Sequence, residues 1–246
     1  MALVLMVTGL GLAIYYAITA DGSAQDDGAS AAPVKVGPGA TEGERRDQIA
    51  ATPMLEVPTD AALSGTPAAT PGEAIEVPPA TTTGPAGIPS GYPKTPEGAA
   101  GQLAAIEIKV MQGMSISYTN EVYKHWALPK GVGAKNWPLT QNVQAFLASA
   151  GQSQTKDTSV TVTTEPAAAQ IKGTDGTEWV VACVLLDVRA EITQEARMAY
   201  GYCERMQWSV GRWMIAPGAS PAKAPSTWPG SQLAQQAGWR TWAEAD

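Results

Sequence analysis

The sequence has very few of the side chains that usually carry catalysis and metal binding. Its 246 residues include one histidine, His125, and two cysteines, Cys183 and Cys203. A structural zinc site needs about four Cys or His ligands, so three such residues this far apart exclude one. A catalyst built on His125 would need a nucleophile or an orienting acid, and no motif in the sequence supplies either. We therefore expect no metal, no cofactor and no catalytic site.

Charge is absent from residues 1–20, which contain no Asp, Glu, Lys, Arg or His. A helix of this length is about 30 Å long, the thickness of a bilayer core. We predict a retained single-pass anchor in the cell membrane, with Tyr15 and Tyr16 at the interface and the following residues outside the cytoplasm. The alternative is a secretory signal cleaved near Ala24, since Gly22 and Ala24 are small enough for a cleavage site.

Aromatic residues are scarce in residues 21–94, which hold 11 of the 19 prolines and many Ala, Gly, Thr and Ser. Such a segment buries too little apolar surface to offset the entropy of ordering it, so we predict a disordered linker. It carries ten acidic and four basic residues, a net charge of −6, whereas residues 95–246 carry thirteen and twelve, a net charge of −1. The acidity therefore belongs to the linker, and no basic patch or motif indicates binding to nucleic acid.

Regular apolar spacing begins at Thr95 and predicts an α+β domain over residues 95–218. Thr95 is suited to cap a helix in which apolar residues recur every three or four positions up to Met114. Two more helices are expected, over residues 118–126 and 137–151. From residue 158 the apolar period changes to two, which is typical of strands. This order predicts about three helices packed on one face of a curved antiparallel sheet.

The strand pattern also predicts the order of the sheet. Strands are expected over residues 158–165, 167–173, 178–192 and 197–209, with a last strand from 212. The segment 178–192 is apolar on both faces and should be a central strand that is covered on both sides. Gly176 marks the turn before it, and Gly211 provides the positive φ that turns Trp208 back towards Trp213.

Cys183 and Cys203 fall on strands that should be neighbours. Direct pairing requires residue numbers on the two strands to sum to 386 (183 + 203), which places Arg189 opposite Arg197. A like-charge pair argues against that register, whereas an extracytoplasmic location permits a disulfide. Both a disulfide and two buried thiols remain open.

Asp187 is the acid most deeply set in an apolar strand. A dyad of His125 and Asp187 facing a cavity is one candidate for a ligand-binding or catalytic site. The alternative is a surface histidine, with Asp187 paired to Arg189 or another base near the end of the strand. We favour the ion pair, because structural ion pairs also perturb carboxylates.

Three tryptophans lie in the C-terminal tail, residues 219–246. Trp239 and Trp242 could join Leu233 and Ala237 on one apolar face of a short helix. That helix would fold back on the domain or dock on a partner.

Two stretches carry a resemblance to a known group of proteins. YPKTPEGAAGQLAAIE, which starts at Tyr92, and ERMQWSVGRWMIAPGASPAKAPSTWPGS, which starts at Glu204, resemble actinobacterial proteins associated with integrative and conjugative elements. The similarity spans residues 91–242. In that group a membrane anchor, a variable linker and a nuclear-transport-factor-2-like domain follow one another. The resemblance implies a cone-shaped domain similar to the extracytoplasmic domains of TcpC-type and VirB-type components of type IV secretion systems.

The same resemblance implies a function. It predicts a non-enzymatic scaffold or assembly subunit of a DNA-transfer complex, whose partners are the membrane, other secretion subunits and further copies of itself. One alternative is a secreted or anchored domain, with or without enzymatic activity, that binds a small ligand on the concave face of the sheet. Another is a secreted protein associated with the cell wall, which requires cleavage near Ala24.

Overall fold

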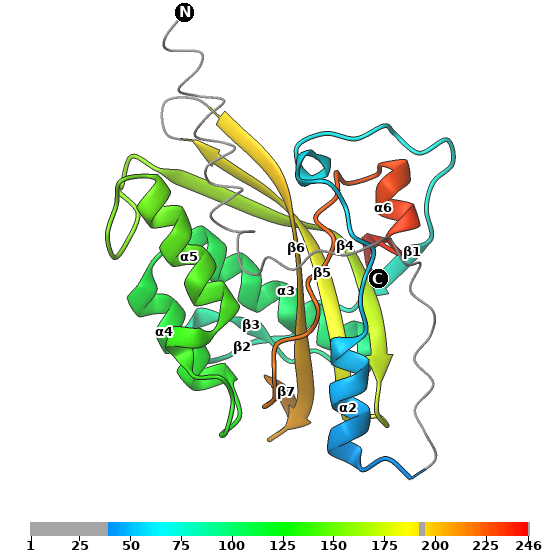
Figure 1. Ribbon diagram of the computed structural model, residues 1–246. Coiled ribbons are helices and arrows are strands. Elements are labelled where there is room, and N and C mark those ends of the chain that lie inside the picture. The colour runs from blue at the N-terminus through cyan, green and yellow to red at the C-terminus, as the bar shows by residue number, and fades with distance from the viewer. Residues whose placement is uncertain (1–38, 192–194, 246) are drawn as a thin grey trace, which may run out of the picture.

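A computed structural model describes residues 39–191 and 195–245, which form an α+β domain around a curled sheet (Figure 1). Six strands lie in the order β1-β8-β4-β5-β6-β7. Their bounds are Ala74–Val77 for β1, Thr161–Thr174 for β4, Trp179–Glu191 for β5, Glu195–Ser209 for β6, Arg212–Ile215 for β7 and Arg240–Glu244 for β8. β1 and β8 are parallel, so the sheet is mixed and not the purely antiparallel one that the sequence predicts. A separate hairpin joins β2, Thr82–Thr83, to β3, Pro89–Ser90.

Three helices cover one face of the sheet, as predicted (Figure 1). They are α3, Pro96–Gly113; α4, Ile116–Trp126; and α5, Pro138–Ser149. The Oγ1 atom of Thr95 accepts a hydrogen bond from the amide of Gly98 at 3.0 Å, so the predicted cap is confirmed. We call the face that these helices cover the inner face and the opposite one the outer face.

β5 is the central strand of the sheet, and its burial on both faces is confirmed. Residues 179–186 are all buried, and β5 pairs with β4 on one side and β6 on the other. The two strands expected over residues 158–173 are one strand, β4, with irregularities between Pro166 and Ala168 and between Ile171 and Gly173. Such bulges bend a strand without ending it, which explains why the period of two breaks inside it.

The hairpin from β6 to β7 has the predicted register. Trp208 pairs with Trp213, and the two rings meet edge to face with centroids 5.5 Å apart. Both Val210 and Gly211 have positive φ, 47° and 79°, which matches the twist of a tight hairpin. Trp213 is buried and its indole N–H donates to the carbonyl of Pro93, so the hairpin is tied to the start of α3.

The prediction of a disordered linker over residues 21–94 is wrong for residues 39–94. This part contains α2, Glu42–Ala51, the short helices η1, Thr59–Ala62, and η2, Pro85–Gly87, and strand β1. Thr41 and Glu44 form a reciprocal capping box at the start of α2. Ile75 and Val77 of β1 are buried, because β1 joins the main sheet by pairing with β8, which lies far along the chain. The composition of residues 39–94 therefore gives too low an estimate of the apolar surface that the segment buries in the folded domain.

The predicted boundaries at residues 95 and 218 are also wrong, because the tail belongs to the domain. β8 lies between β1 and β4, so the sheet is completed by both ends of the described chain. The tail does contain a short helix, α6, Gln232–Gln236, but Trp239 and Trp242 lie beyond it and not on its face. The indole N–H of Trp239 donates to the carbonyl of Pro225 at 3.0 Å.

No helix within residues 39–191 and 195–245 is long and apolar enough to cross a bilayer. The predicted anchor, residues 1–20, lies outside the described residues.

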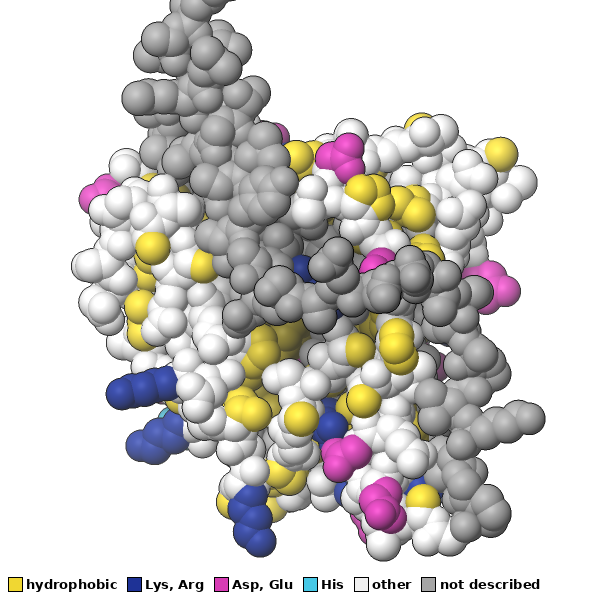
Figure 2. Space-filling model, in the orientation of Figure 1, with side chains coloured by type: hydrophobic (Ala, Val, Ile, Leu, Met, Phe, Trp, Pro, Cys, Tyr) yellow, Lys and Arg dark blue, Asp and Glu magenta, His cyan; other side chains and the backbone are white. Residues whose placement is uncertain are grey.

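Basic side chains gather on one corner of the face shown in Figure 2, over the end of α4 and the segment that follows it. Lys124 in α4, and Lys130 and Lys135 after it, are exposed. Acidic side chains are spread over other parts of the face in Figure 2. Hydrophobic side chains on this face are scattered and do not form one continuous patch.

Candidate functional site

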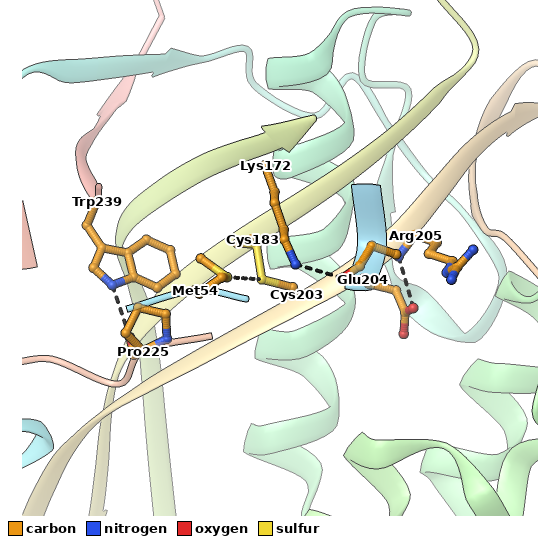
Figure 3. The surroundings of a disulfide bond; sticks show 9 residues. Met54, Lys172, Cys183, Cys203, Glu204, Arg205, Pro225 and Trp239 are labelled. Carbon is orange, nitrogen blue, oxygen red and sulfur yellow. Dashed lines mark hydrogen bonds between the residues drawn. A yellow bond between two sulfur atoms is a disulfide. The ribbon is translucent and has the colours of Figure 1, made fainter. Parts of the chain in front are cut away.

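Cys183 and Cys203 are directly opposite each other on β5 and β6 and form a disulfide (Figure 3). Their Cα atoms are 4.0 Å apart, and both residues are buried on the outer face. The sulfur of Met54 lies 3.5 Å from that of Cys203. The disulfide therefore sits under the segment that follows α2, where it joins strands that are already paired. The disulfide has a structural role, because neither cysteine keeps an ionisable thiol once the bond has formed.

The register that pairs the cysteines does place Arg189 opposite Arg197. Asp187 lies beside both: its carboxylate accepts hydrogen bonds from Arg197 at 2.6 and 2.8 Å and from Arg189 at 3.3 Å. The guanidinium of Arg197 also lies 4.6 Å from the ring centroid of Trp228 in the tail. The like-charge pair is therefore tolerated because one carboxylate is shared between the two cations.

The structure does not bring His125 and Asp187 together. Burial opposes ionisation of Asp187, but Arg197 and then Arg189 outweigh it and lower the pKa of that carboxyl. Asp187 is on the outer face, whereas His125 is exposed in the last turn of α4, where its backbone carbonyl accepts from Arg212 at 3.0 Å. Neither residue lines the pockets of the described chain that are considered below. The ion-pair interpretation of Asp187 is the one that the structure supports.

A pocket of about 320 Å³ lies between α5, the edge of β6 and the tail segment 220–226. Its polar lining comes from Asn136, Gln141, Asn142, Tyr200, Tyr202, Ser220, Lys223 and Ser226. The tail is held close to β6 at Gly201, whose amide donates to Ser226 Oγ at 3.0 Å. A Cβ atom on Gly201 would come within 2.8 Å of the Pro225 carbonyl oxygen, so only glycine permits this approach.

Two larger pockets, of about 400 and 590 Å³, lie against the segments that cover the outer face. Residues 53–59 and 222–226 line the first; residues 68–74, parts of β4 and the region of α6 line the second. The larger one is lined mainly by alanine, proline and glycine. The pocket beside Tyr200 has more polar side chains converging from three separate segments, which is what a ligand site requires. We take it as the candidate functional site.

Behind the two tyrosines lies a buried acidic cluster, made of Glu107 on α3 and Glu204 on β6. Glu204 accepts hydrogen bonds from the hydroxyl of Tyr202 at 2.6 Å, from the indole N–H of Trp137 at 3.0 Å and from the amide of Arg205 at 3.0 Å. Glu107 is fully buried, and neither of its carboxyl oxygens has a hydrogen-bond partner among the described residues. The carboxyl group of Glu204 therefore has hydrogen-bond partners, whereas that of Glu107 has none among the described residues.

The environment of both acids disfavours their ionised form. Burial, followed by the charge of Glu204, raises the pKa of Glu107 well above its ordinary value. Burial also raises the pKa of Glu204, although the hydrogen bonds from Tyr202 and Trp137 oppose it. Burial favours the neutral form of Glu107, because a lone buried carboxylate loses its hydration without a compensating partner.

The hydrogen bonds also fix what the tyrosines can do. Tyr200 is buried, and its hydroxyl oxygen accepts from the side-chain amide of Asn142. Tyr202 donates its proton to Glu204. The two rings are nearly parallel, with an angle of 12° and centroids 6.3 Å apart. One tyrosine therefore keeps a proton to donate into the pocket, and the other keeps only lone pairs.

Sequence reasoning missed all of these residues, although a signal for two of them was present. Glu107 stands four residues after Leu103 and three before Val110, so it lies on the apolar stripe of its helix. Glu204 alternates with Tyr202 and Met206 and therefore shares their buried face. An acid at a core position is informative in itself, because unpaired acids are rarely buried.

No group of His, Cys, Asp and Glu within residues 39–191 and 195–245 is arranged to hold a metal ion. Comparison with known proteins found no match to the chain among family models, curated proteins or solved structures. The α+β fold and the pocket with its buried acids are therefore the basis on which a function has to be argued.

Proposed function

We propose that this chain is a non-enzymatic, membrane-anchored scaffold subunit of a conjugation-type DNA-transfer complex, with its folded domain outside the cytoplasm. The sequence resemblance motivates the proposal. The structural observation that carries it is where the folded domain begins along the chain: α2, its first helix, is capped by Thr41. Only residues 21–40 then separate the domain from the predicted anchor, in place of the 74-residue linker (21–94) that the sequence suggested.

The length of the segment between the predicted anchor and the domain, residues 21–40, limits how far the domain can lie from the membrane. The sequence predicts a flexible linker for residues 21–40, and a flexible chain of 20 residues typically spans about 25 Å, against about 50 Å for the longer linker. The domain would stay next to the membrane surface, within reach of domains that neighbouring membrane subunits present. A position so close to the membrane favours a subunit of a membrane complex over a protein that acts in or beyond the cell wall.

The architecture agrees with the expected domain type. A cone-shaped, nuclear-transport-factor-2-like domain requires helices on one face of a curled sheet, and α3, α4 and α5 lie in that arrangement. Partner contacts in such a subunit would be made by the domain, with further copies of the chain among the partners. Fold alone does not define function, so the assignment has to be tested by its partners.

The test is chemical crosslinking in membranes followed by affinity recovery of the chain. Full-length protein should recover the ATPase or channel subunits of the secretion complex, and a chain that lacks residues 1–20 should not. A third variant with 40 Gly/Ser residues inserted after Gly28 keeps anchor and domain but lengthens the tether to about 45 Å. We expect it to lose most of the crosslinks. Full-length protein that is recovered alone from the culture medium would overturn the proposal.

A second function is favoured by the pocket beside Tyr200. The domain would then bind a small ligand between α5, β6 and the tail, as a carrier or sensor. The specific observation is that polar side chains converge on a pocket of about 320 Å³, a size within the ordinary range for small-molecule sites. The pocket is on the helix-covered side of the sheet, where this alternative requires a ligand, but it is built from Tyr200 and Asn142 and not from His125 or Asp187.

A further inference from the structure

The pocket presents hydrogen-bond donors and acceptors side by side on one strand. Tyr200 accepts from Asn142 and is left with a hydroxyl proton to donate, whereas Tyr202 has given its proton to Glu204 and is left with lone pairs. The residues are two positions apart on β6, and their ring centroids are separated by 6.3 Å. The partners are fixed in the fold, since Glu204 is buried on β6 and Asn142 is half-buried on α5.

The opposite wall repeats this mixture. Asn136 and Gln141 contribute side-chain amides, each with both an oxygen acceptor and an NH₂ donor. Ser226 accepts from the amide of Gly201, so its hydroxyl proton remains available for a further bond. A ligand that fits this lining must itself offer closely spaced groups that both donate and accept.

The charges around the pocket disfavour an ionic ligand. A carboxylate or phosphate would approach Glu204, which three donors hold in the wall behind Tyr202. A cationic ligand would meet Lys223, which lines the tail side. Either ion would lose hydration on entry without gaining an unopposed partner. A neutral ligand avoids both costs.

We propose that this pocket binds a neutral, polyhydroxylated ligand, a sugar of one or two pyranose rings. Every hydroxyl of a sugar both donates and accepts, which matches the alternation of Tyr200 and Tyr202 and the amides opposite. The flat apolar faces of the ring would lie against the two parallel tyrosine rings. The inference rests on the second function above and names its ligand class; it does not depend on the scaffold role.

The test uses N,N′-diacetylchitobiose as the neutral sugar probe, with saturation-transfer NMR and titration on the full-length chain in detergent micelles. Gln141→Ala removes a lining amide, and Gln144→Ala is its matched control, because Gln144 is exposed on the same helix outside the pocket. Tyr200→Phe removes the donor hydroxyl. We expect the probe to bind, with affinity about three- to tenfold weaker in Gln141→Ala and Tyr200→Phe and unchanged in Gln144→Ala.

Glucuronate and glucosamine test the neutrality of the site, and a neutral dipeptide amide tests the ligand class. Tighter binding of either charged sugar overturns the charge argument, and binding of the dipeptide amide alone overturns the sugar assignment while a ligand site remains. Equal weakening by Gln141→Ala and Gln144→Ala, or no binding of any probe by a parent chain that unfolds cooperatively, overturns the site itself. The scaffold role is scored separately, since the crosslinks of Gln141→Ala should match those of the parent.

Discussion

The two faces of the sheet are covered in different ways. The inner face is covered by three helices that are consecutive in sequence, α3, α4 and α5, and it contains the unsatisfied Glu107. The outer face is covered by chain from both ends, with α2 on one side and the tail on the other, and it contains the disulfide. Contacts on the outer face join distant segments, as in the hydrogen bond from Arg205 to Asp47 at 2.7 Å.

The difference indicates a division of roles. On the outer face, contacts from α2 hold distant parts of the chain together: Arg46 lies 5.5 Å from the ring centroid of Trp179, and Lys172 donates to the carbonyl of Ala50 at 2.6 Å. On the inner face the polar groups include one that weakens the fold. Local conflicts of this kind are expected at functional sites, where stability is given up for a binding geometry.

Removal of the N-terminal cover should have the largest effect. A chain that begins at residue 95, the boundary that the sequence suggested, lacks α2 and β1 and leaves buried outer-face side chains such as Cys183 open to water. We expect it to lose its cooperative unfolding transition, measured by near-UV circular dichroism, and to bind a hydrophobic dye. A chain that begins at Gly39 is the control and should unfold cooperatively. A native near-UV spectrum for the chain from residue 95 would show that the outer cover is dispensable.

The disulfide comes next. Replacement of both Cys183 and Cys203 by alanine should lower the free energy of unfolding by about 3 kcal/mol, because the cross-link closes a loop with a sequence separation of 20 residues. Urea denaturation measures the change. A reducing agent should destabilise the parent by a similar amount and leave the double variant unaffected. If the parent is insensitive to reductant, the cross-link does not stabilise the domain.

Glu107→Met should act in the opposite direction and raise the free energy of unfolding at pH 7 by about 1–3 kcal/mol, since it removes an unpaired polar group from an apolar site. The pKa of Glu107 is raised in the folded state, so its contribution is fully present below the unfolded pKa near 4.5 and is lost as pH rises through the folded pKa. The parent should therefore lose stability above about pH 4.5, and the variant should lose less.

Glu121→Met is the matched control for this prediction, because Glu121 is exposed on α4 and its replacement should change stability by less than about 0.5 kcal/mol. Denaturation at several pH values, monitored by tryptophan fluorescence, gives both numbers. A Glu107→Met variant that is less stable than the parent at pH 7 would mean that the carboxyl holds the fold and is not a cost to it.

The smallest effect is expected at Asp187. Asp187→Asn leaves Arg189 and Arg197 facing each other and should cost no more than about 1 kcal/mol, because both guanidinium groups are partly exposed. The pKa of Asp187 is lowered in the folded state, so its contribution is present above the unfolded pKa and is lost as pH falls through the folded pKa. The difference between parent and variant should therefore vanish in acid. A difference that is larger in acid would contradict this assignment.

Much of the local structure followed from periodicity. The helix that starts at Thr95, the central position of β5 and the pairing of Trp208 with Trp213 all rest on patterns within about 20 residues, and all three are confirmed. The disordered linker failed for a different reason. Ile75 and Val77 are too few to build a core, but they complete one when β1 pairs with β8, 167 positions further along the chain.

The candidate site was the part of the structure that the sequence predicted least well. Each of its walls comes from a separate segment, and the role of Tyr200 depends on Asn142, which is 58 residues earlier in the chain. Glu107 could have been noticed on its apolar stripe, but nothing local shows that it lacks a partner. Asp187 and His125 were candidates because an acid in an apolar strand and a single histidine are unusual. Residue type alone does not show which face or pocket a side chain lies on.

The sequence by itself determined the α+β class, the three helices and the hairpin that pairs Trp208 with Trp213. These follow from short-range rules: side chains repeat every 3.6 residues in a helix and every two in a strand, and turns need residues that accept positive φ. Only the tertiary structure decided that residues 39–94 are part of the domain, that the tail adds β8 between β1 and β4, and that Tyr200, Asn142 and Ser226 share one pocket. The physical reason is that burial and hydrogen bonding are satisfied by whichever group is near in space, and distance along the chain does not predict that nearness.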